Sequence, residues 1–304
     1  MSQLYQSYSQ KMPNNALSFD EMPLPSKVVM LRPDFFEVGH AINPHMKDSE
    51  GSFNQVDKQK ALGQWDHLRQ IYRELGFEPV IFNPLSACPD MVFCANQSLP
   101  YLSDKGEKRA ILSRMASPIR RPEVESIAAD LQNQDYQTEL LPIIDQDIFF
   151  EGTGDALWVP GRRLLCGGYG FRTHESVYED VSRLTNTSIV LFELKNPRFY
   201  HLDTCLSIIN DRIVLACREA FTESDWEMLQ RLFSDVIPVN LSEADSPGFS
   251  CNAHSPDGQH VIIQKGNRHT ITALEQRGLQ AIECDTSEFV KSGGSVFCMK
   301  LMLF

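Results

Sequence analysis

The sequence predicts an α/β protein assembled from about five successive units of strand, strand, helix and strand. Two observations support this fold class. Five segments carry apolar residues at three- and four-residue spacing, which is typical of amphipathic helices, and each is followed by a short apolar run typical of a buried strand. The helices begin roughly 45 to 65 residues apart, a period that favours a radial or repeat architecture. An irregular α/β sheet fits the same spacing and stays open at this point.

Each of the five helices has a sequence basis. They are expected over residues 56–75, 122–131 and 175–184, from Thr222 to Phe233, and over residues 268–276. Thr222 is a good N-cap for the fourth helix, with Asp225 three residues further on. Gly76 and Gly278 stand where the first and fifth helices are expected to end, because glycine readily adopts the left-handed conformation of a helix C-terminus.

One short apolar strand follows each helix, at residues 79–82, 140–143, 189–192, 236–239 and 280–283. Further strand-like stretches cover residues 156–166, 205–217 and 261–264. Turn sequences such as Pro160-Gly161 and Asn210-Asp211 are expected to split the longer stretches into hairpins. A chain of 304 residues could hold two domains, but no Pro/Ser-rich linker divides this one, so a single domain is favoured.

Composition excludes several classes of protein. Forty acidic and 28 basic side chains give a net charge of −12, which argues against a nucleic-acid-binding protein. No run is apolar enough for a membrane span, and the N-terminus lacks the apolar core of a secretory signal, so a cytoplasmic chain is expected. The eight cysteines form no C-x-x-C pair, so neither a disulfide framework nor a zinc site is expected. The sequence does not specify the oligomeric state, and a homo-oligomer stays open.

Two segments place polar side chains between apolar strands. Burial of such groups costs free energy unless they are hydrogen-bonded or bind a ligand. Asp90 and Asn96 flank the apolar stretch between them, and they could equally be turn residues that bound a strand. Glu151 and Asp155 enclose a Gly-x-Gly bend between two apolar runs. That bend is not a dinucleotide-binding loop, because the third glycine is missing and no helix is expected to open after it. Its glycines would instead let the backbone approach a ligand closely.

Three further segments suggest a nucleophile and its partners. His201 and Asp203 are two residues apart, so on a strand both would face the same side. Gly293-Gly294 leads directly to Cys298, which fits a thiolate nucleophile that folding brings to an acid/base partner. Arg120 and Arg172 each precede an expected helix, and a guanidinium can grip a carboxylate with two hydrogen bonds. Each of these groups taken singly could also be structural or solvated.

Taken in chain order, these motifs resemble the guanidine-modifying (pentein) superfamily, which includes arginine deiminases, dimethylarginine dimethylaminohydrolases and amidinotransferases. The resemblance implies a five-bladed α/β propeller of ββαβ units with pseudo-fivefold symmetry. The likeness runs over residues 28–304, which are therefore expected to form one catalytic domain after an N-terminal extension over residues 1–27. It implies no cofactor and no metal, and a small guanidino-containing substrate as the partner.

The same resemblance assigns roles to individual residues. It implies that Cys298 is the nucleophile and His201 the acid/base, with Glu151 holding the substrate guanidinium. The residues implied to bind substrate are Asn96, Asp90, Asp203, Asn43, Arg120, Arg172 and Phe93. Within this set, Asp203 would share the guanidinium, and Asn43, Arg120 and Arg172 would hold the α-carboxylate.

Three segments resemble the arginine dihydrolase branch most closely: residues 42–46, residues 93–96 and residues 169–173. Deiminases of the superfamily generally have Asp where this chain has Asn96. An arginine dihydrolase, which converts arginine to ornithine, carbon dioxide and ammonia, is therefore the favoured function. A single-step deiminase or dimethylargininase and an amidinotransferase are the alternatives within the superfamily. A binding or regulatory module on the same scaffold, and a zinc or redox cysteine protein, are the alternatives from other classes.

Overall fold

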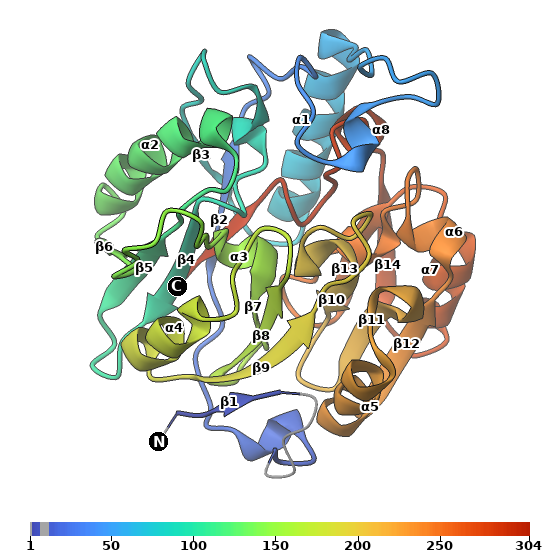
Figure 1. The fold of residues 1–304 in the computed structure, drawn as a ribbon. Coiled ribbons are helices and arrows are strands. Elements are labelled where there is room, and N and C mark those ends of the chain that lie inside the picture. The colour runs from blue at the N-terminus through green and yellow to red at the C-terminus, as the bar shows by residue number, and fades with distance from the viewer. Residues whose placement is uncertain (1, 7–11) are drawn as a thin grey trace.

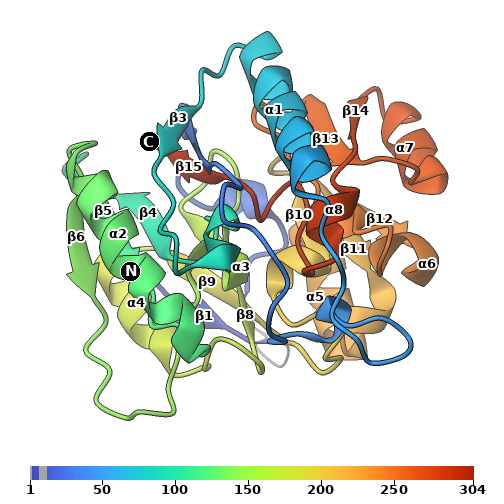
Figure 2. The same ribbon diagram turned by 90° about the horizontal axis from the view of Figure 1, so that it is seen from above.

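The computed structural model describes residues 2–6 and 12–304, and this part of the chain folds into five small mixed sheets. The five longer helices lie at the periphery, and the short helix α3 (Gly152–Asp155) lies near the middle in both views (Figures 1 and 2). In each sheet a helix connects two parallel strands, which is the connection that parallel pairing requires. The expected α/β class with five strand–helix–strand units is confirmed.

The first two sheets are formed mainly by strands from the N-terminal half of the chain. The first has the order β15 (Leu301–Leu303), β2 (Lys27–Leu31) and β3 (Val80–Phe82), with α1 (Lys58–Glu74) between β2 and β3. Its outer strand β15 comes from the end of the chain and pairs antiparallel with β2. The second has the order β4 (Ser98–Leu102), β5 (Lys108–Leu112) and β6 (Gln137–Leu140), with α2 (Arg121–Gln132) between β5 and β6.

In the third and fourth sheets, two strands form an antiparallel hairpin, and a third strand pairs parallel with the second strand of that hairpin. The third contains β7 (Ala156–Trp158), β8 (Leu164–Tyr169) and β9 (Ser188–Glu193), with α4 (Val177–Thr185) between β8 and β9. The fourth contains β10 (Leu206–Ile208), β11 (Ile213–Cys217) and β12 (Asp235–Val239), with α5 (Glu223–Leu232) between β11 and β12.

The fifth sheet is the smallest. It contains β13 (His260–Gln264) and β14 (Gln280–Cys284), joined by α7 (Arg268–Glu275). An isolated antiparallel bridge between His254 and Ile262 stands where the other sheets have a first strand. The remaining short helices are α6 (Leu241–Ala244) and α8 (Ser287–Val290).

The N-terminal segment packs on this framework. Strand β1 (Leu4–Tyr5) pairs parallel with β9 at the edge of the third sheet. Met12 and Ala16 are buried in the largest apolar cluster, together with side chains of the third and fourth sheets. Within residues 2–6 and 12–304, no helix combines the length and apolar character needed to cross a membrane.

Two local predictions are wrong. The strand expected at residues 140–143 ends at Leu140, because Pro142 has no N–H to continue the ladder. His201 and Asp203 were expected on a strand, but His201 caps a 3-10 turn over Leu202–Thr204 that contains Asp203. The Thr204 hydroxyl and N–H both donate to the His201 carbonyl, at 2.6 and 3.2 Å, so local side-chain bonding replaces the strand.

Candidate active site

Eight of the ten predicted site residues line one small cavity, although they are spread from position 43 to position 298. These eight are Asn43, Asp90, Phe93, Asn96, Arg120, Arg172, His201 and Cys298. The other two, Glu151 and Asp203, lie directly behind the lining and hydrogen-bond His201 and Cys298, respectively. The fold therefore brings all ten residues to one place.

The Cys298 thiol is enclosed by polar partners. Its Sγ lies 3.3 Å from Oδ2 of Asp203 and 3.1 Å from Nδ2 of Asn252. Burial, followed by the negative charge of Asp203, raises the pKa of the Cys298 thiol well above its usual value. The hydrogen bond from Asn252 acts in the opposite direction. A cation placed beside this sulfur would favour the reactive thiolate.

Asn252 is a site residue that the sequence analysis missed. Its Oδ1 accepts hydrogen bonds from the backbone N–H groups of Ser295 (3.0 Å) and Cys298 (3.2 Å). Its Nδ2 donates to the Asp203 carbonyl at 3.0 Å as well as to Sγ. One buried amide thus ties the segment that carries the cysteine to the turn that carries Asp203. Asn252 stands in no motif whose spacing would have marked it.

His201 is paired with Glu151. Nε2 of His201 lies 2.7 Å from Oε2 of Glu151, and both side chains are buried. Glu151 Oε1 accepts the Ala116 N–H at 2.9 Å. Burial alone would raise the pKa of Glu151, but the charge of Arg172 and the hydrogen bond from His201 lower it to about 2. Glu151 is therefore ionised at neutral pH and holds an N–H of His201.

The glycine-rich bend packs directly against this pair. The predicted Gly-x-Gly bend is the short helix α3. A Cβ at Gly154 would lie 2.4 Å from Nδ2 of Asn96, so only glycine lets the bend approach Asn96 and His201 this closely. Asp155, at the end of the bend, lies 4.0 Å from Nε2 of His201, and burial raises its pKa to about 6.

The buried carboxylate of Asp203 has few hydrogen-bond partners. Oδ2 accepts the contact from Cys298, whereas Oδ1 has no hydrogen-bond partner in the described part of the chain. Burial raises the pKa of Asp203 to about 7, although the hydrogen bond from Cys298 and the charge of Lys300 oppose this rise. A buried, incompletely paired carboxylate is suited to a cationic ligand.

Arg120 holds Asn96 in one orientation. NH1 of Arg120 donates to Oδ1 of Asn96 at 2.9 Å, which leaves the Asn96 amide nitrogen 3.5 Å from Nδ1 of His201. The Arg120 guanidinium also pairs with buried Glu123 at 2.9 Å and donates to the carbonyl of Phe93 at 3.0 Å. Most of its donors are thus engaged by protein groups, and the carboxylate-binding role implied for Arg120 stays a prediction.

Arg172 and Asn43 lie on another wall of the cavity. The Arg172 guanidinium stacks over the ring of Tyr200 at 5.1 Å and pairs with Glu151 at 3.1 Å. It also donates to the Ile42 carbonyl at 2.5 Å, which fixes the segment that carries Asn43. Asn43 Nδ2 donates to the carbonyl of Ser292 at 2.9 Å, close to the glycine turn before Cys298.

The remaining predicted residues fix the cavity walls. Asp90 pairs with His40 at 2.7 Å and accepts the Ser292 hydroxyl at 3.2 Å. Phe93 packs so closely on Gly294 that a Cβ there would lie 2.4 Å from its ring. Among the residues that the structure describes, no three His, Cys, Asp or Glu side chains form a group that could hold a metal ion. A thiol, an imidazole held by a carboxylate and buried acids suit nucleophilic attack on a cationic carbon.

Comparisons with known proteins agree with this chemistry. The profile of the family described as "N,N dimethylarginine dimethylhydrolase, eukaryotic" matches residues 32–304. A Mycobacterium tuberculosis N(G),N(G)-dimethylarginine dimethylaminohydrolase is 35% identical over 279 residues, which cover 92% of this chain and 86% of that protein. The bifunctional arginine dihydrolase/ornithine cyclodeaminase ArgZ of Synechocystis is 30% identical over 90% of this chain, but the match covers only 37% of that longer protein.

Solved structures show the same relationship. The N-terminal domain of ArgZ, a cyanobacterial arginine dihydrolase solved with its substrate as a cysteine-to-serine variant, superposes with a TM-score of 0.82. That match is 30% identical and covers 91% of this chain and 97% of the domain. A dimethylarginine dimethylaminohydrolase adduct, at 21% identity and a TM-score of 0.70, shares the fold. The chain therefore belongs to the N,N dimethylarginine dimethylhydrolase family of the guanidine-modifying (pentein) superfamily, and it is a hydrolase of C–N bonds in linear amidines.

Proposed function

We propose that this chain is an arginine dihydrolase, which converts arginine and two molecules of water into ornithine, carbon dioxide and two molecules of ammonia through a covalent intermediate on Cys298. The observation that carries the proposal is the orientation of Asn96. Its oxygen is fixed by Arg120, and its amide N–H₂ faces His201 at the cavity wall. An amide at this position can donate a hydrogen bond, whereas a carboxylate can only accept one.

The first half of the reaction uses the sulfur and the imidazole. The Cys298 thiol gives its proton to His201, and the resulting thiolate attacks the guanidinium carbon and forms a tetrahedral adduct. His201 gives a proton to the departing ammonia, which leaves a covalent amidino-thioether, and it then takes a proton from the attacking water. The C–S bond breaks and citrulline is released from the sulfur. Asp203 and Glu151 are the negative groups that would hold the cationic guanidinium in line for attack.

Hydrogen-bond partners assign the roles of the two His201 nitrogens. Because Arg120 occupies the Asn96 oxygen, the Asn96 amide nitrogen is the atom that faces Nδ1, so Nδ1 accepts and Nε2 carries the proton donated to Glu151. Nδ1 is then the unprotonated nitrogen, and its lone pair has only the long contact of 3.5 Å with Asn96. It is the atom that would take the proton from water in each half-reaction.

The second half of the reaction depends on keeping citrulline in the site. Its ureido carbonyl oxygen is an acceptor, and the Asn96 N–H₂ group can donate to it. A retained ureido carbon is open to a second attack by the thiolate. This attack expels the ornithine amine or ammonia, and a second water releases the carbon as carbon dioxide. An aspartate in place of Asn96 would present oxygen to oxygen and favour release of citrulline.

A product analysis on two variants tests the proposal. Asn96→Asp keeps the oxygen that Arg120 holds and changes only the atom that faces His201. The wild type should yield ornithine from arginine, and Asn96→Asp should raise the citrulline-to-ornithine ratio by at least about tenfold, the effect of one lost hydrogen bond. Cys298→Ala should yield neither product. The exposed amide Asn133 gives a matched control, because Asn133→Asp should leave the ratio unchanged.

Two results would reject the dihydrolase assignment. Accumulation of citrulline alone by the wild-type enzyme would mean that the reaction stops after the first hydrolysis. An unchanged product ratio in Asn96→Asp would mean that Asn96 does not select the outcome. Turnover by Cys298→Ala would instead reject the nucleophile and leave the product question open.

A dimethylargininase is the second candidate, and the family profile together with the 35% identical relative favours it. The same assay decides between the two when asymmetric dimethylarginine is supplied beside arginine. Release of dimethylamine at a higher kcat/KM than ornithine formation would favour the dimethylargininase. A preference for arginine would favour the dihydrolase.

We further propose that the five sheets are arranged as the blades of a propeller around a pseudo-fivefold axis. Four of the five described sheets share the order antiparallel strand, central strand, parallel strand. The site residues come from segments near the strand ends of different sheets, as a central site would require.

A further inference from the structure

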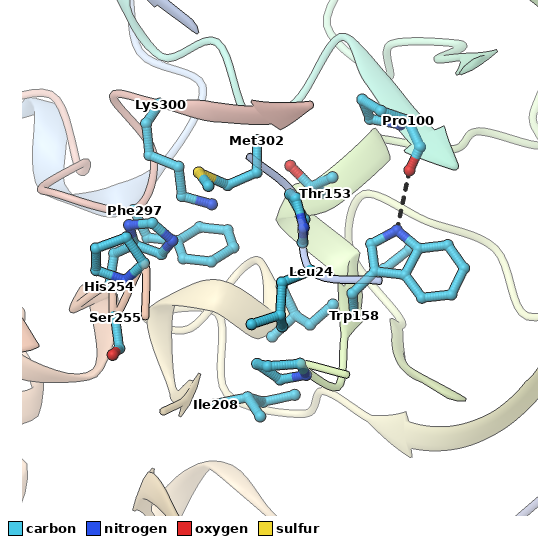
Figure 3. A pocket seen from close by; sticks show the side chains of 15 residues that line it. Leu24, Pro100, Thr153, Trp158, Ile208, His254, Ser255, Phe297, Lys300 and Met302 are labelled. Atoms are coloured by element: carbon cyan, nitrogen blue, oxygen red, sulfur yellow. Dashed lines mark hydrogen bonds between the residues drawn. The ribbon is translucent and has the colours of Figure 1, made fainter. Parts of the chain in front are cut away.

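A second cavity lies apart from the active-site cavity. Most of its wall is apolar. Leu24, Trp158, Ile208, Phe297 and Met302 contribute to that wall, and Figure 3 shows these side chains around a common space. The residues that line this cavity and those that line the active-site cavity are entirely different.

One charged side chain points into this apolar space. Lys300 is only 3% exposed, and its amine projects between Phe297 and Met302 (Figure 3). Nζ lies 3.3 Å from the centroid of the Phe297 ring. Within residues 2–6 and 12–304, no hydrogen-bond acceptor and no ion-pair partner engages this amine. An amine buried without an acceptor is costly, so its cavity is expected to supply one when occupied.

The protein provides no anion in the cavity itself. None of the lining residues is an aspartate or a glutamate. Asp203 attracts Lys300 electrostatically, but it forms no ion pair with it and lies behind Cys298 instead of in the wall. Burial, and then the charge of Lys300, lower the pKa of the lining His254 well below its usual value, so His254 stays neutral. Burial lowers the pKa of Lys300 to about 7, so its amine is only partly protonated at neutral pH, and it is the one lining group that can carry a positive charge there. A bound carboxylate would favour the protonated amine.

The chemistry of this wall selects a narrow class of ligand. One ammonium can neutralise one negative charge, and the wall offers no second cation for a dianion such as phosphate. The apolar and aromatic surroundings favour burial of a hydrocarbon or aromatic body. A cationic or strongly polar molecule would find neither a carboxylate nor enough polar partners.

We propose that this cavity is a second ligand site that binds a small apolar monocarboxylate, with its carboxylate on Nζ of Lys300 and its apolar body against Phe297, Ile208 and Trp158. The site is separate from the one that carries the hydrolase reaction. It nevertheless adjoins it in the chain, since Lys300 follows Cys298 by two residues.

The binding of 4-phenylbutyrate, measured by isothermal titration calorimetry, tests the proposal. Its uncharged counterpart 4-phenylbutan-1-ol serves as the ligand control. The wild type should bind one 4-phenylbutyrate per chain and should bind the alcohol at least about tenfold more weakly, as expected for the loss of a hydrogen bond to a charged group. Lys300→Met removes the amine, keeps an unbranched apolar side chain that is one atom shorter, and should weaken 4-phenylbutyrate binding by a similar factor.

Two variants of Leu24, at the mouth of the cavity, test the proposal even if Lys300→Met does not fold. Leu24 is 50% exposed, so its replacement should not disturb the core. Leu24→Asp adds a negative charge at the mouth, and Leu24→Asn is its neutral counterpart of nearly the same shape. Only Leu24→Asp should weaken 4-phenylbutyrate binding by electrostatic repulsion, by several-fold relative to Leu24→Asn.

Competition with arginine shows which cavity is occupied. In the Cys298→Ala variant, which cannot consume arginine, saturating arginine should leave the 4-phenylbutyrate affinity unchanged. Three results would overturn the proposal: no binding by the wild type, equal affinity in Leu24→Asp and Leu24→Asn, or displacement of 4-phenylbutyrate by arginine. The last result would place the compound in the active site.

Discussion

The Cys298 thiol begins from an unfavourable state for a nucleophile. Burial and the neighbouring Asp203 charge both favour the protonated thiol, and the hydrogen bond from Asn252 opposes them. A guanidinium that enters the cavity would place a positive charge beside both Sγ and Asp203, which favours the thiolate. Substrate binding and thiol activation are therefore expected to occur together.

Asn252 is expected to act as a positioning residue for this thiol. Asn252→Ala removes the donor to Sγ and the acceptor for the Cys298 N–H, so the pKa of the thiol should rise and kcat should fall by about 10- to 100-fold. The measurement is the pH dependence of Cys298 alkylation by iodoacetamide, corrected with Cys298→Ala. A purely structural role for Asn252 would lower stability without moving that profile to higher pH. Asn133→Ala, at an exposed position, should change neither quantity.

Asp203 should give the reaction a pH dependence near neutrality. Folding raises its pKa from the usual value of 3.8 to about 7, so the carboxylate that attracts a guanidinium is ionised only as the pH rises through about 7. We expect kcat/KM for arginine to increase through that range and Asp203→Asn to lose this limb of the profile. An unchanged limb in Asp203→Asn would assign it to another group.

The same shift has a consequence for stability. Because the folded pKa of Asp203 exceeds the unfolded one, its contribution to stability is complete below about pH 4 and is lost as the pH rises through about 7. Asp203→Asn should therefore be more stable than the wild type at pH 8 and should lose this advantage near pH 4. Urea denaturation at both pH values measures the difference.

The sequence predicted which residues gather at the site but not how they pair. Motifs and the family resemblance identified His201 and Cys298, since both stand in short, distinctive segments. Nothing in the sequence indicated that Arg120 would turn inward to Glu123 and Asn96, because ion pairing depends on how helix α2 docks. Asn252 was missed because its role depends on hydrogen bonds with Asp203, Ser295 and Cys298, which lie far from it in the sequence.

At the scale of elements, the helices were predicted well because an apolar face at helical spacing leaves few alternatives. The expected helix at residues 56–75 is α1 (Lys58–Glu74), and Gly76 follows it with a φ of +87°. Strand ends and turns were predicted less well, because they depend on single hydrogen bonds. The His201–Asp203 turn is one case, where a hydroxyl bond to a carbonyl decides between strand and 3-10 turn.

The predicted N-cap of α5 can be tested directly. Thr222 Oγ1 accepts the Asp225 N–H at 3.1 Å, as the sequence indicated. Thr222→Ala leaves that N–H without its cap and should lower the free energy of unfolding by about 1 kcal/mol. Glu227→Ala, at an exposed position of the same helix, should change it by less than about 0.5 kcal/mol. Equal urea midpoints for the two variants would show that the cap contributes nothing to stability.

At the scale of the whole molecule, the boundary between extension and catalytic domain stays a prediction. Strand β2 begins at Lys27, which is close to the predicted start of the domain at residue 28. Yet the preceding segment adds β1 to the edge of the third sheet and buries Met12, Ala16 and Met22. It also supplies Leu24 and Pro25 to the second cavity, whereas none of its described residues lines the active-site cavity. Stability and second-site binding should therefore depend on the extension more than catalysis does.

Removal of residues 1–25 separates these contributions. The truncated chain should lose at least about 3 kcal/mol of unfolding free energy, because burial of one large apolar side chain alone contributes about 1.5 to 3 kcal/mol. It should also expose β9 as a free edge and aggregate more readily on heating.

Where it remains folded at low temperature, the truncated chain should still convert arginine with a KM near that of the full chain but should not bind 4-phenylbutyrate. The full-length Leu24→Asn variant controls for the loss of the cavity mouth alone. If the truncated chain is as stable as the full one, the extension does not contribute to the stability of the domain. If the truncated chain folds but no longer converts arginine, the catalytic domain begins before residue 26.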